Sequence, residues 1–420
     1  MAKTVFIFTV SFPYSSGQEN SFLQNEITEL CKSFDKIIII PLQVNDEKQI
    51  LNSKVDIETS FATHNKAKRT IKALKCLYNI SIFKLLMLEL FTNPKIIFNY
   101  KKMKILLNNL IDTNYKFLWI NNYFKNNLTE NALAYSYWFT STTTALCLSK
   151  KNYPKLKVIT RAHGIDLYKI QNSYYPFRKY ALKYIDMVIL VSLAAKEYLS
   201  NEYSEYKNKF VLHRLGVLNH SKTNSLNNSK GFNIVSCSSI IPVKRIDLMA
   251  NGILDFAKKN KNTNIFWHHF GDGYLLNAIS KLLEMAPANL KYTQYGHVNN
   301  DKVLEFYSSN PVNVFITTSL SEGGCPVSIQ EAYSFGIPSI GTAVGGIPEI
   351  IDNENGVLLS ENPNVEEISN ALSLFCNDSV SVEEKRKASK KKYNDFFNAE
   401  KNFREFVDTI SDLLSVRATN

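Results

Sequence analysis

A glycine pair followed by a helical pattern is the part of this sequence best suited to bind an anion. Gly323 and Gly324 allow the backbone to approach a ligand closely. The run from Val327 to Phe335 has helical spacing, and Gly336 with Pro338 ends it. The first backbone amides of a helix have no partner within the helix, and the helix dipole is positive there. The sequence therefore predicts a phosphate-binding loop at the start of this helix.

Two carboxylates flank the predicted phosphate-binding loop. Glu322 lies in the loop and Glu331 lies on the helix, with eight residues between them. Ionised carboxylates accept hydrogen bonds from hydroxyl groups. Amides that bind phosphate beside carboxylates that bind hydroxyls suit a sugar nucleotide, which carries a diphosphate, a ribose and a second sugar.

A histidine and two cations follow other strand-like runs, where ligands bind in doubly wound sheets. His163 comes shortly after the run KVIT and precedes a glycine, so a tight turn can present its ring. A hydrogen-bonded structural histidine is the alternative. Lys244 and Arg245 stand together at a helix start. The helix dipole disfavours cations there unless an anion is near, so the pair predicts phosphate contacts, with a solvated surface pair as the alternative.

The segment SEGGCPVSIQEAYSFGIPSIGTAVGGIPEII resembles the donor-binding element of the retaining GT-B glycosyltransferases of family 4, the glycosyltransferase group 1 domain. Glu331 stands in the matching motif QEAYSFGIP, and VGGIPEI also matches. The interval from Glu322 to Glu331 is one residue longer than in the family. Lys244 matches the family's diphosphate-binding lysine, whereas Ser239 replaces the family's arginine. Arg245 is expected to supply the missing cation.

Two more loops resemble family elements. Gly17, after the strand-like run KTVFIFTV, is expected to let the backbone approach a phosphate, and Glu19 to contact acceptor hydroxyls. A turn with no ligand is the alternative for both residues. Gly271, in the sequence FGDG, resembles the family's glycine turn near the nucleotide. His163 resembles the family histidine that reaches the donor sugar, while Asp166 is expected to cap the helix that follows it.

The resemblance and the residue chemistry together predict one site. Lysine, arginine and free amides would hold the leaving phosphate electrostatically, and carboxylates would hold ribose and donor-sugar hydroxyls. No covalent nucleophile and no cofactor are expected. No metal is expected either, because the sequence has no Asp-x-Asp pair to hold a divalent ion. The predicted residues are His163, Glu322 and Lys244 as catalytic groups; Arg245, Gly323, Gly324, Glu331, Gly17 and Gly271 as donor-binding groups; and Glu19 as the acceptor-binding group.

The length and composition of the chain predict its domain count and its cellular compartment. A chain of 420 residues is too long for one ordinary core, so two domains are expected. Six cysteines without paired spacing fit a reducing cytoplasm and provide no metal cage. The N-terminal apolar run is too short to span a membrane and lacks a signal-peptide cleavage pattern, so it is expected to be a buried strand. No apolar window is long enough for a transmembrane helix.

The net charge of +11 requires a negatively charged partner to be considered. Nucleic acid is not expected, because no nucleic-acid motif accompanies the charge. Basic and apolar residues alternate between Lys66 and Lys104, where Glu89 is the only acid. This pattern suits an anionic membrane surface. A solvated helical face over an ordinary core is the alternative.

Strand-like and helix-like runs alternate along the chain, which predicts an α/β fold of parallel sheets. The expected architecture is GT-B, with two doubly wound Rossmann-like domains facing a cleft and a C-terminal helix crossing back to the first domain. The predicted boundaries are an acceptor-side domain at 1–218, a linker at 219–231, a nucleotide-sugar domain at 232–385 and returning helices at 386–420.

The function expected from these observations is retaining, metal-independent transfer of a sugar from a nucleotide-diphosphate donor to an acceptor hydroxyl. Bacterial cell-envelope polysaccharide assembly is expected, such as capsule or lipopolysaccharide, with a glycan or lipid-linked glycan as acceptor. The expected location is the cytoplasm or the inner face of the membrane. The alternatives are a sugar-nucleotide epimerase or phosphorylase on the same fold, and a non-catalytic scaffold of a glycan-assembly complex.

Overall fold

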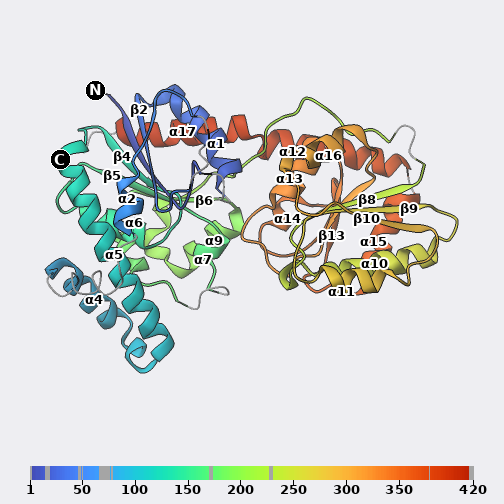
Figure 1. Ribbon diagram of the computed structural model, residues 1–420, viewed down its shortest axis with the longest axis horizontal. Coiled ribbons are helices and arrows are strands. Elements are labelled where there is room, and N and C mark those ends of the chain that lie inside the picture. The colour runs from blue at the N-terminus through green and yellow to red at the C-terminus, as the bar shows by residue number, and fades with distance from the viewer. Residues whose placement is uncertain are drawn as a thin grey trace. The chain divides into compact units, whose positions relative to one another are not determined.

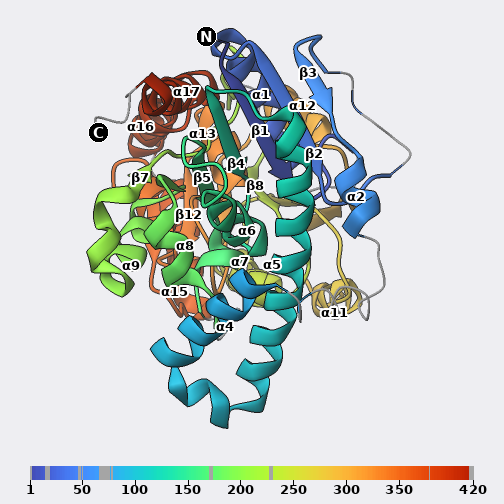
Figure 2. The same ribbon diagram turned by 90° about the vertical axis from the view of Figure 1, so that its left-hand side faces the viewer.

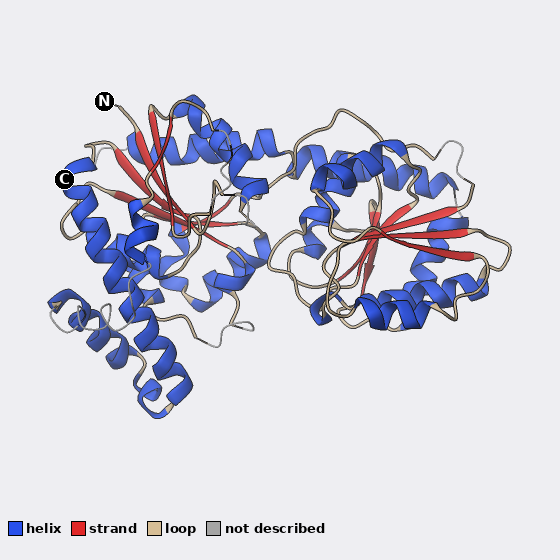
Figure 3. Ribbon diagram, viewed as in Figure 1, coloured by secondary structure: helices blue, strands red, loops and turns tan. Residues whose placement is uncertain are grey.

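The computed structural model describes residues 2–14, 19–45, 49, 51–65, 76, 79–169, 174–226, 230–377 and 379–415. The chain forms two compact units, each built on one sheet (Figure 1). Unit 1 holds residues 1–213 together with 400–420, and unit 2 holds residues 214–399. In each unit the strands form a central layer with helices on both faces (Figure 3).

The sheet of unit 1 is parallel, with the order β3-β2-β1-β4-β5-β6-β7. Its strands alternate their side chains between two buried faces, as the apolar runs in the sequence predict. The strands are β1 (Thr4–Thr9), β2 (Lys36–Pro41), β3 (Val55–Ile57), β4 (Ala132–Ser136), β5 (Lys157–Ala162), β6 (Met187–Leu190) and β7 (Phe210–Leu212).

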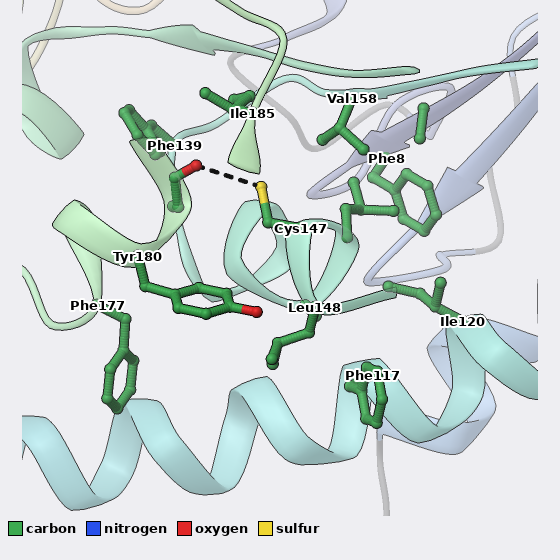
Figure 4. Packing of buried hydrophobic residues seen from close by; sticks show 14 of the residues in the cluster. Phe8, Phe117, Ile120, Phe139, Cys147, Leu148, Val158, Phe177, Tyr180 and Ile185 are labelled. Atoms are coloured by element: carbon green, nitrogen blue, oxygen red, sulfur yellow. Dashed lines mark hydrogen bonds between the residues drawn. The ribbon is translucent and has the colours of Figure 1, made fainter. Parts of the chain in front are cut away.

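Different helices cover the two faces of the unit 1 sheet. One face packs against α1 (Asn20–Ser33) and α17 (Ala399–Ser415). The other packs against α5 (Tyr100–Asn127) and α6 (Ser141–Ser149), where Cys147 and Leu148 lie among aromatic and aliphatic side chains (Figure 4). The other helices of unit 1 within the described residues are α2 (Ser60–Asn65), α4 (Ile80–Thr92), η1 (Pro94–Phe98), α7 (Gly164–Leu167), α8 (Arg178–Tyr184), α9 (Leu193–Glu202) and η2 (Ser204–Lys209).

The sheet of unit 2 is also parallel, with the order β10-β9-β8-β11-β12-β13. Its strands are β8 (Phe232–Cys237), β9 (Ile265–Phe270), β10 (Leu290–Gln294), β11 (Val314–Thr317), β12 (Ser339–Thr342) and β13 (Gly356–Leu359). One core includes α10 (Ile246–Lys259), α11 (Leu276–Leu283) and α15 (Val365–Asn377). The opposite core includes α12 (Asn300–Ser309), α13 (Val327–Ser334), α14 (Ile347–Ile350) and α16 (Ser379–Phe396), and η3 (Pro242–Lys244) follows β8.

The architecture confirms the prediction of two doubly wound α/β domains and of a C-terminal helix that joins the first of them. Phe406, Val407 and Ile410 of α17 lie in the core of unit 1. The predicted domain boundaries differ from the two units. The returning helices were expected from residue 386, but α16 belongs to unit 2, where Arg386 donates hydrogen bonds to the carbonyl oxygens of Val312 and Asn224. Only α17 returns to unit 1.

Both sheets reverse their strand order at one point, between β1 and β4 in unit 1 and between β8 and β11 in unit 2. The loops that leave neighbouring strands at such a point run in opposite directions and leave a crevice at the carboxyl edge of the sheet. Ligands of doubly wound folds bind there. Each unit therefore offers one position at which site residues are expected.

None of the helices in the described part of the chain is long and apolar enough to cross a membrane.

Candidate active site

Lys244 and Glu322 meet at the point where unit 2 reverses its strand order. Lys244 ends η3, which follows β8, and Glu322 lies in the loop after β11. The Lys244 ammonium donates to Glu322 Oε1 in an ion pair, and both side chains are largely shielded from solvent. Two predicted catalytic residues, 78 positions apart in the sequence, are thus brought into contact at the crevice.

A second glycine loop holds the Glu322 loop in place. Gly345 has a φ of +55°, and a Cβ added there would lie 1.8 Å from the carbonyl oxygen of Glu322. A Cβ on Gly346 would lie 2.4 Å from the carbonyl carbon of Gly324. The backbone approach therefore requires glycine at both positions. Helix α13 begins shortly after this loop at Val327, as the sequence predicts.

Glu331 lies on α13, buried behind a cavity wall. It is 6% exposed, and burial raises the pKa of its carboxyl to about 7, although a hydrogen bond with the Asn300 side chain opposes that rise. A carboxyl with this pKa exchanges its proton near neutral pH. The same pKa makes Glu331 sensitive to a ligand, because hydroxyl donors that bond to the carboxylate favour its ionised form.

A cavity of about 840 Å³ lies at the carboxyl ends of β8, β9 and β10. Its lining includes Ser239 from the loop after β8, Gly271 from the turn after β9, and Asn300 at the start of α12. Gly271 has a φ of +134°, and a Cβ there would lie 2.0 Å from the Ser238 carbonyl oxygen. The predicted glycine turn thus packs directly on the loop that leads to Lys244.

The sequence analysis did not identify three polar side chains near the site. Two of them line this cavity, and the third contacts the VGGIPEI motif. His297 and Asn300 line the cavity after β10, and Asn300 is the hydrogen-bond partner of Glu331. The signal for both was the polar sequence GHVNN directly after a strand-like run. Arg214 was not singled out either, and its Nη2 lies 2.9 Å from Glu349 Oε2 in the VGGIPEI motif.

Arg245 does not serve as the cation that the sequence analysis expected. Its Nε donates to the Thr318 carbonyl oxygen at 2.7 Å, and its Nη2 donates to the carbonyl oxygens of Ser319 and Glu361, each at 2.9 Å. Nη1 donates to Asn362 Oδ1 at 3.2 Å. With its donors directed at the protein, the guanidinium joins the loop after β11 to the segment before α15. Arg245 also has a φ of 48°, a conformation the sequence pattern did not indicate.

The Arg245→Met variant should therefore lose stability because several carbonyl oxygens lose their donor. We expect the free energy of unfolding to fall by about 2–3 kcal/mol in urea denaturation. The Lys258→Met variant, at an exposed position of α10, is the control and should stay near the wild-type value. An Arg245→Met variant with unchanged stability and lost nucleotide binding would restore Arg245 as a ligand-binding residue.

His163 directly follows β5 in unit 1, and its ring packs against two neighbouring aromatic side chains. Its centroid lies 4.3 Å from that of Trp138 and 5.0 Å from that of Tyr137. Burial, together with a smaller contribution from the nearby Arg161 charge, lowers the pKa of His163 to about 3, so the imidazole is neutral at pH 7. Asp166 was expected to cap a helix that follows it, but it lies inside the short helix α7, whose N-cap is His163. From there its Oδ1 accepts from the His163 backbone amide.

The Glu19 carboxylate binds its own chain, so the prediction that it contacts acceptor hydroxyls needs correction. It is 2% exposed and accepts from the backbone amides of Val10, Ser11 and Phe12 and from Trp138 Nε1. These contacts fix the loop after β1 to the loop after β4, at the reversal point of unit 1. Gly17 lies outside the described residues.

Within the described ranges of the chain, no cluster of three or more His, Cys, Asp or Glu side chains could hold a metal ion. Cys325 donates through Sγ to the Gly346 carbonyl oxygen, and burial raises the pKa of its thiol to about 12. A thiol with that pKa is not a thiolate nucleophile at neutral pH.

Part of this chain resembles known glycosyltransferases in sequence. Residues 219–395 match the family model of the glycosyl transferases group 1. The GtfA subunit of the UDP-N-acetylglucosamine–peptide N-acetylglucosaminyltransferase of Streptococcus agalactiae is 26% identical over 211 residues, which is 49% of this chain and 40% of that protein. The chain spans about half the length of the curated relatives it matches.

Solved structures show that the fold is GT-B. The lipopolysaccharide outer core galactosyltransferase WaaB aligns over 98% of this chain and 99% of its own, with a TM-score of 0.68 and 14% identity. The pneumococcal O-GlcNAc transferase GtfA, solved with UDP and GlcNAc, aligns over 72% of this chain and 61% of its own, with a TM-score of 0.56 and 18% identity.

Proposed function

We propose that this chain is a glycosyltransferase that moves a sugar from a nucleotide-diphosphate donor to an acceptor hydroxyl, with retention of the anomeric configuration. The observation that carries the proposal is the contact between Lys244 and Glu322 at the reversal point of the unit 2 sheet. A cavity with Asn300 and the buried Glu331 behind it lies at the same edge. Retention comes from the family resemblance alone.

The residues divide the chemistry in a simple way. Breaking the bond between the sugar and the diphosphate leaves negative charge on the phosphate and positive character on the sugar. Lys244, held in a partly dry site, stabilises the leaving phosphate. Glu322 accepts from hydroxyls of the donor sugar or stabilises its positive character, and Glu331 accepts from the ribose. Arg245 acts on the loop rather than on the phosphate.

The donor proposed here is a UDP-sugar. The support is that the pneumococcal GtfA structure contains UDP and GlcNAc, and that a further GT-B neighbour, HepE from Anabaena, was solved with UDP. Thermal unfolding in the presence of UDP, GDP and ADP tests the choice of base, because a ligand that binds only the folded chain raises the unfolding temperature. UDP should raise it most. An equal response to all three, or none, would contradict a UDP-specific site.

The acceptor proposed here is a glycan or lipid-linked glycan of the bacterial cell envelope, with the reaction on the cytoplasmic side. Unit 1 offers a place for its hydroxyl-bearing end. A cavity of about 360 Å³ is lined by residues that follow β4 and β5, with Trp138, Ile165 and Arg178 among them. Trp138 also packs on His163. Aromatic walls suit the apolar faces of sugar rings.

The reaction should proceed without a divalent metal. The chain has no Asp-x-Asp pair, and the cationic Lys244 performs the charge neutralisation that a metal would supply. Saturating EDTA is expected to leave the initial rate of sugar transfer unchanged. Loss of the rate in EDTA, with recovery on addition of magnesium, would overturn metal independence while leaving the donor site in place.

A non-catalytic scaffold of a glycan-assembly complex is the second candidate. Ser239 stands where the family has an arginine, the Glu322 loop is one residue longer, and Arg245 does not fill the missing position. A chain with one phosphate-binding cation would still bind nucleotide yet turn over poorly. Nucleotide binding without donor turnover favours this candidate.

A further inference from the structure

The structure points to a helical hairpin of unit 1, residues 80–107, as a docking element for an anionic lipid surface. We propose that α4, η1 and the start of α5 bind a membrane rich in anionic lipid, with their apolar side chains in the headgroup region and their lysines on the phosphates. The hairpin projects from the sheet-containing part of unit 1 in both views (Figures 1 and 2).

Exposed apolar side chains concentrate on this hairpin. It holds nine of the twenty exposed large hydrophobic residues in the described part of the chain. Phe91 is 89% exposed and Phe98 is 91% exposed. The nine are Ile80, Phe83, Met87, Leu88, Phe91, Ile97, Phe98, Tyr100 and Leu107.

Helix α4 presents these side chains as one continuous stripe. Ile80, Phe83, Met87 and Phe91 recur at helical spacing, and Leu88 lies beside them. The opposite face, with Ile82, Leu85 and Glu89, is buried in unit 1. A helix with apolar residues on both faces is stabilised when both faces are buried. Unit 1 buries only one face of α4.

The charge of the hairpin identifies the partner. Residues 80–107 hold five lysines and one acid, Glu89. Glu89 is buried and accepts hydrogen bonds from the Phe177 amide at 3.1 Å and from Asn93 Nδ2 at 3.0 Å, which leaves it facing the protein. The exposed face therefore carries positive charge only. The lysines are Lys84, Lys95, Lys101, Lys102 and Lys104.

An anionic lipid surface satisfies both properties of this face. Aromatic and aliphatic side chains enter the boundary between headgroups and acyl chains, and lysines bind the lipid phosphates. A second copy of the chain would bring the same positive charges into contact, which is unfavourable. The residues at 66–75, which the sequence analysis also assigned to a basic stretch, lie outside the described residues and are not needed.

Membrane binding by the hairpin does not depend on the proposed function. Only its biological role does, which is to bring the enzyme to a lipid-linked acceptor. Vesicle binding is therefore measured with the full chain and with neither donor nor acceptor. The chain should co-sediment with vesicles of phosphatidylglycerol and phosphatidylcholine, bind vesicles of phosphatidylcholine alone much more weakly, and dissociate at high salt. Nucleotide binding, measured separately, decides the proposed function.

Two variants with matched controls test the two components of the surface. Phe91→Ser with Phe98→Ser should lower the vesicle partition coefficient at least about tenfold. Replacing Lys84, Lys95, Lys101 and Lys104 by Gln should lower it on the order of a hundredfold. The controls in unit 2 are Met285→Ser, where Met285 is 87% exposed, and Gln at the exposed Lys261, Lys281, Lys291 and Lys302. Both controls should bind vesicles like the wild-type chain.

Three results would overturn the proposal. The first is equal binding to neutral and anionic vesicles, or to neither. The second is loss of binding in the unit 2 controls to the same extent as in the hairpin variants. The third is a concentration-dependent dimer in sedimentation velocity that the Phe91→Ser and Phe98→Ser substitutions abolish, since the apolar face would then bind a second copy.

Discussion

The Glu331→Gln variant is expected to bind nucleoside diphosphate at least about tenfold more weakly at pH 8 than the wild-type chain. At that pH the Glu331 carboxyl, whose pKa is raised to about 7, is ionised. Under the proposed function it would then accept charge-assisted hydrogen bonds from the ribose. Gln preserves the shape and loses the charge, which weakens a charge-assisted hydrogen bond that is worth roughly 1.5–3 kcal/mol. Isothermal titration with UDP measures the change.

The same substitution should stabilise the folded chain at pH 8. The pKa of Glu331 is raised from 4.5 to about 7 by folding, so the folded state binds the extra proton between these values. The wild-type free energy of unfolding therefore falls as pH rises from 4.5 to 7, by up to roughly 3 kcal/mol from this group. Gln cannot ionise, so the variant should lack that decline.

An exposed glutamate provides the control for both measurements. Glu284→Gln, at the end of α11, should change neither UDP affinity nor the pH profile of stability. A more stable variant that binds its ligand less well is typical of a group kept for function at a cost in stability. If Glu331→Gln bound UDP like the wild-type chain, the ribose contact would be wrong even if the pH profile changed as expected.

The Lys244→Met variant should lower donor turnover by about 10²-fold or more. Its ammonium is expected to stabilise the charge that develops on the leaving phosphate, and removal of one such group typically costs 10²–10³ in rate. The substitution also leaves the Glu322 carboxylate without its partner in a shielded position. Part of any effect could therefore come from that unpaired charge rather than from the phosphate.

A double variant separates the effect of the unpaired charge on stability from the loss of the two active-site groups. Lys244→Met with Glu322→Gln removes the unpaired charge, so its free energy of unfolding should recover toward the wild-type value while turnover stays low. Lys291→Met, at an exposed position of β10, is the matched control for loss of a lysine in unit 2. Recovery of turnover together with stability in the double variant would reduce the Lys244–Glu322 pair to a structural ion pair.

Fold class and the loop that precedes α13 were predictable from sequence because local patterns determine them. Apolar runs separated by helical periods specify two parallel sheets, and each sheet places the residues after its strands along one edge. The sequence placed Lys244 and Glu322 at this edge for that reason, and their roles stay predictions. Lys244 and Glu322 are in contact because β8 and β11 are neighbours in the sheet. The order of the strands cannot be derived from the sequence alone.

The wrong predictions concern side-chain direction. Arg245 adopts a positive φ and turns its guanidinium toward carbonyl oxygens, and nothing in IIPVKRID indicates this. The Glu19 carboxylate binds three backbone amides of the loop after β1 and Trp138 from a distant segment. Asn300 was missed because its importance depends on the proximity of Glu331. In each case the deciding partner is far away in sequence or is a backbone atom.

The central claim is that this chain breaks the bond between a sugar and a nucleoside diphosphate, and donor hydrolysis without acceptor tests it most directly. We expect purified full-length chain to release UDP from UDP-sugars, including UDP-N-acetylglucosamine, in proportion to enzyme concentration. The Lys244→Met variant, folded and at equal concentration, should release about 10²-fold less. A chain that binds UDP in calorimetry but releases none from any donor, in EDTA or in magnesium, would contradict catalysis and identify a nucleotide-binding scaffold.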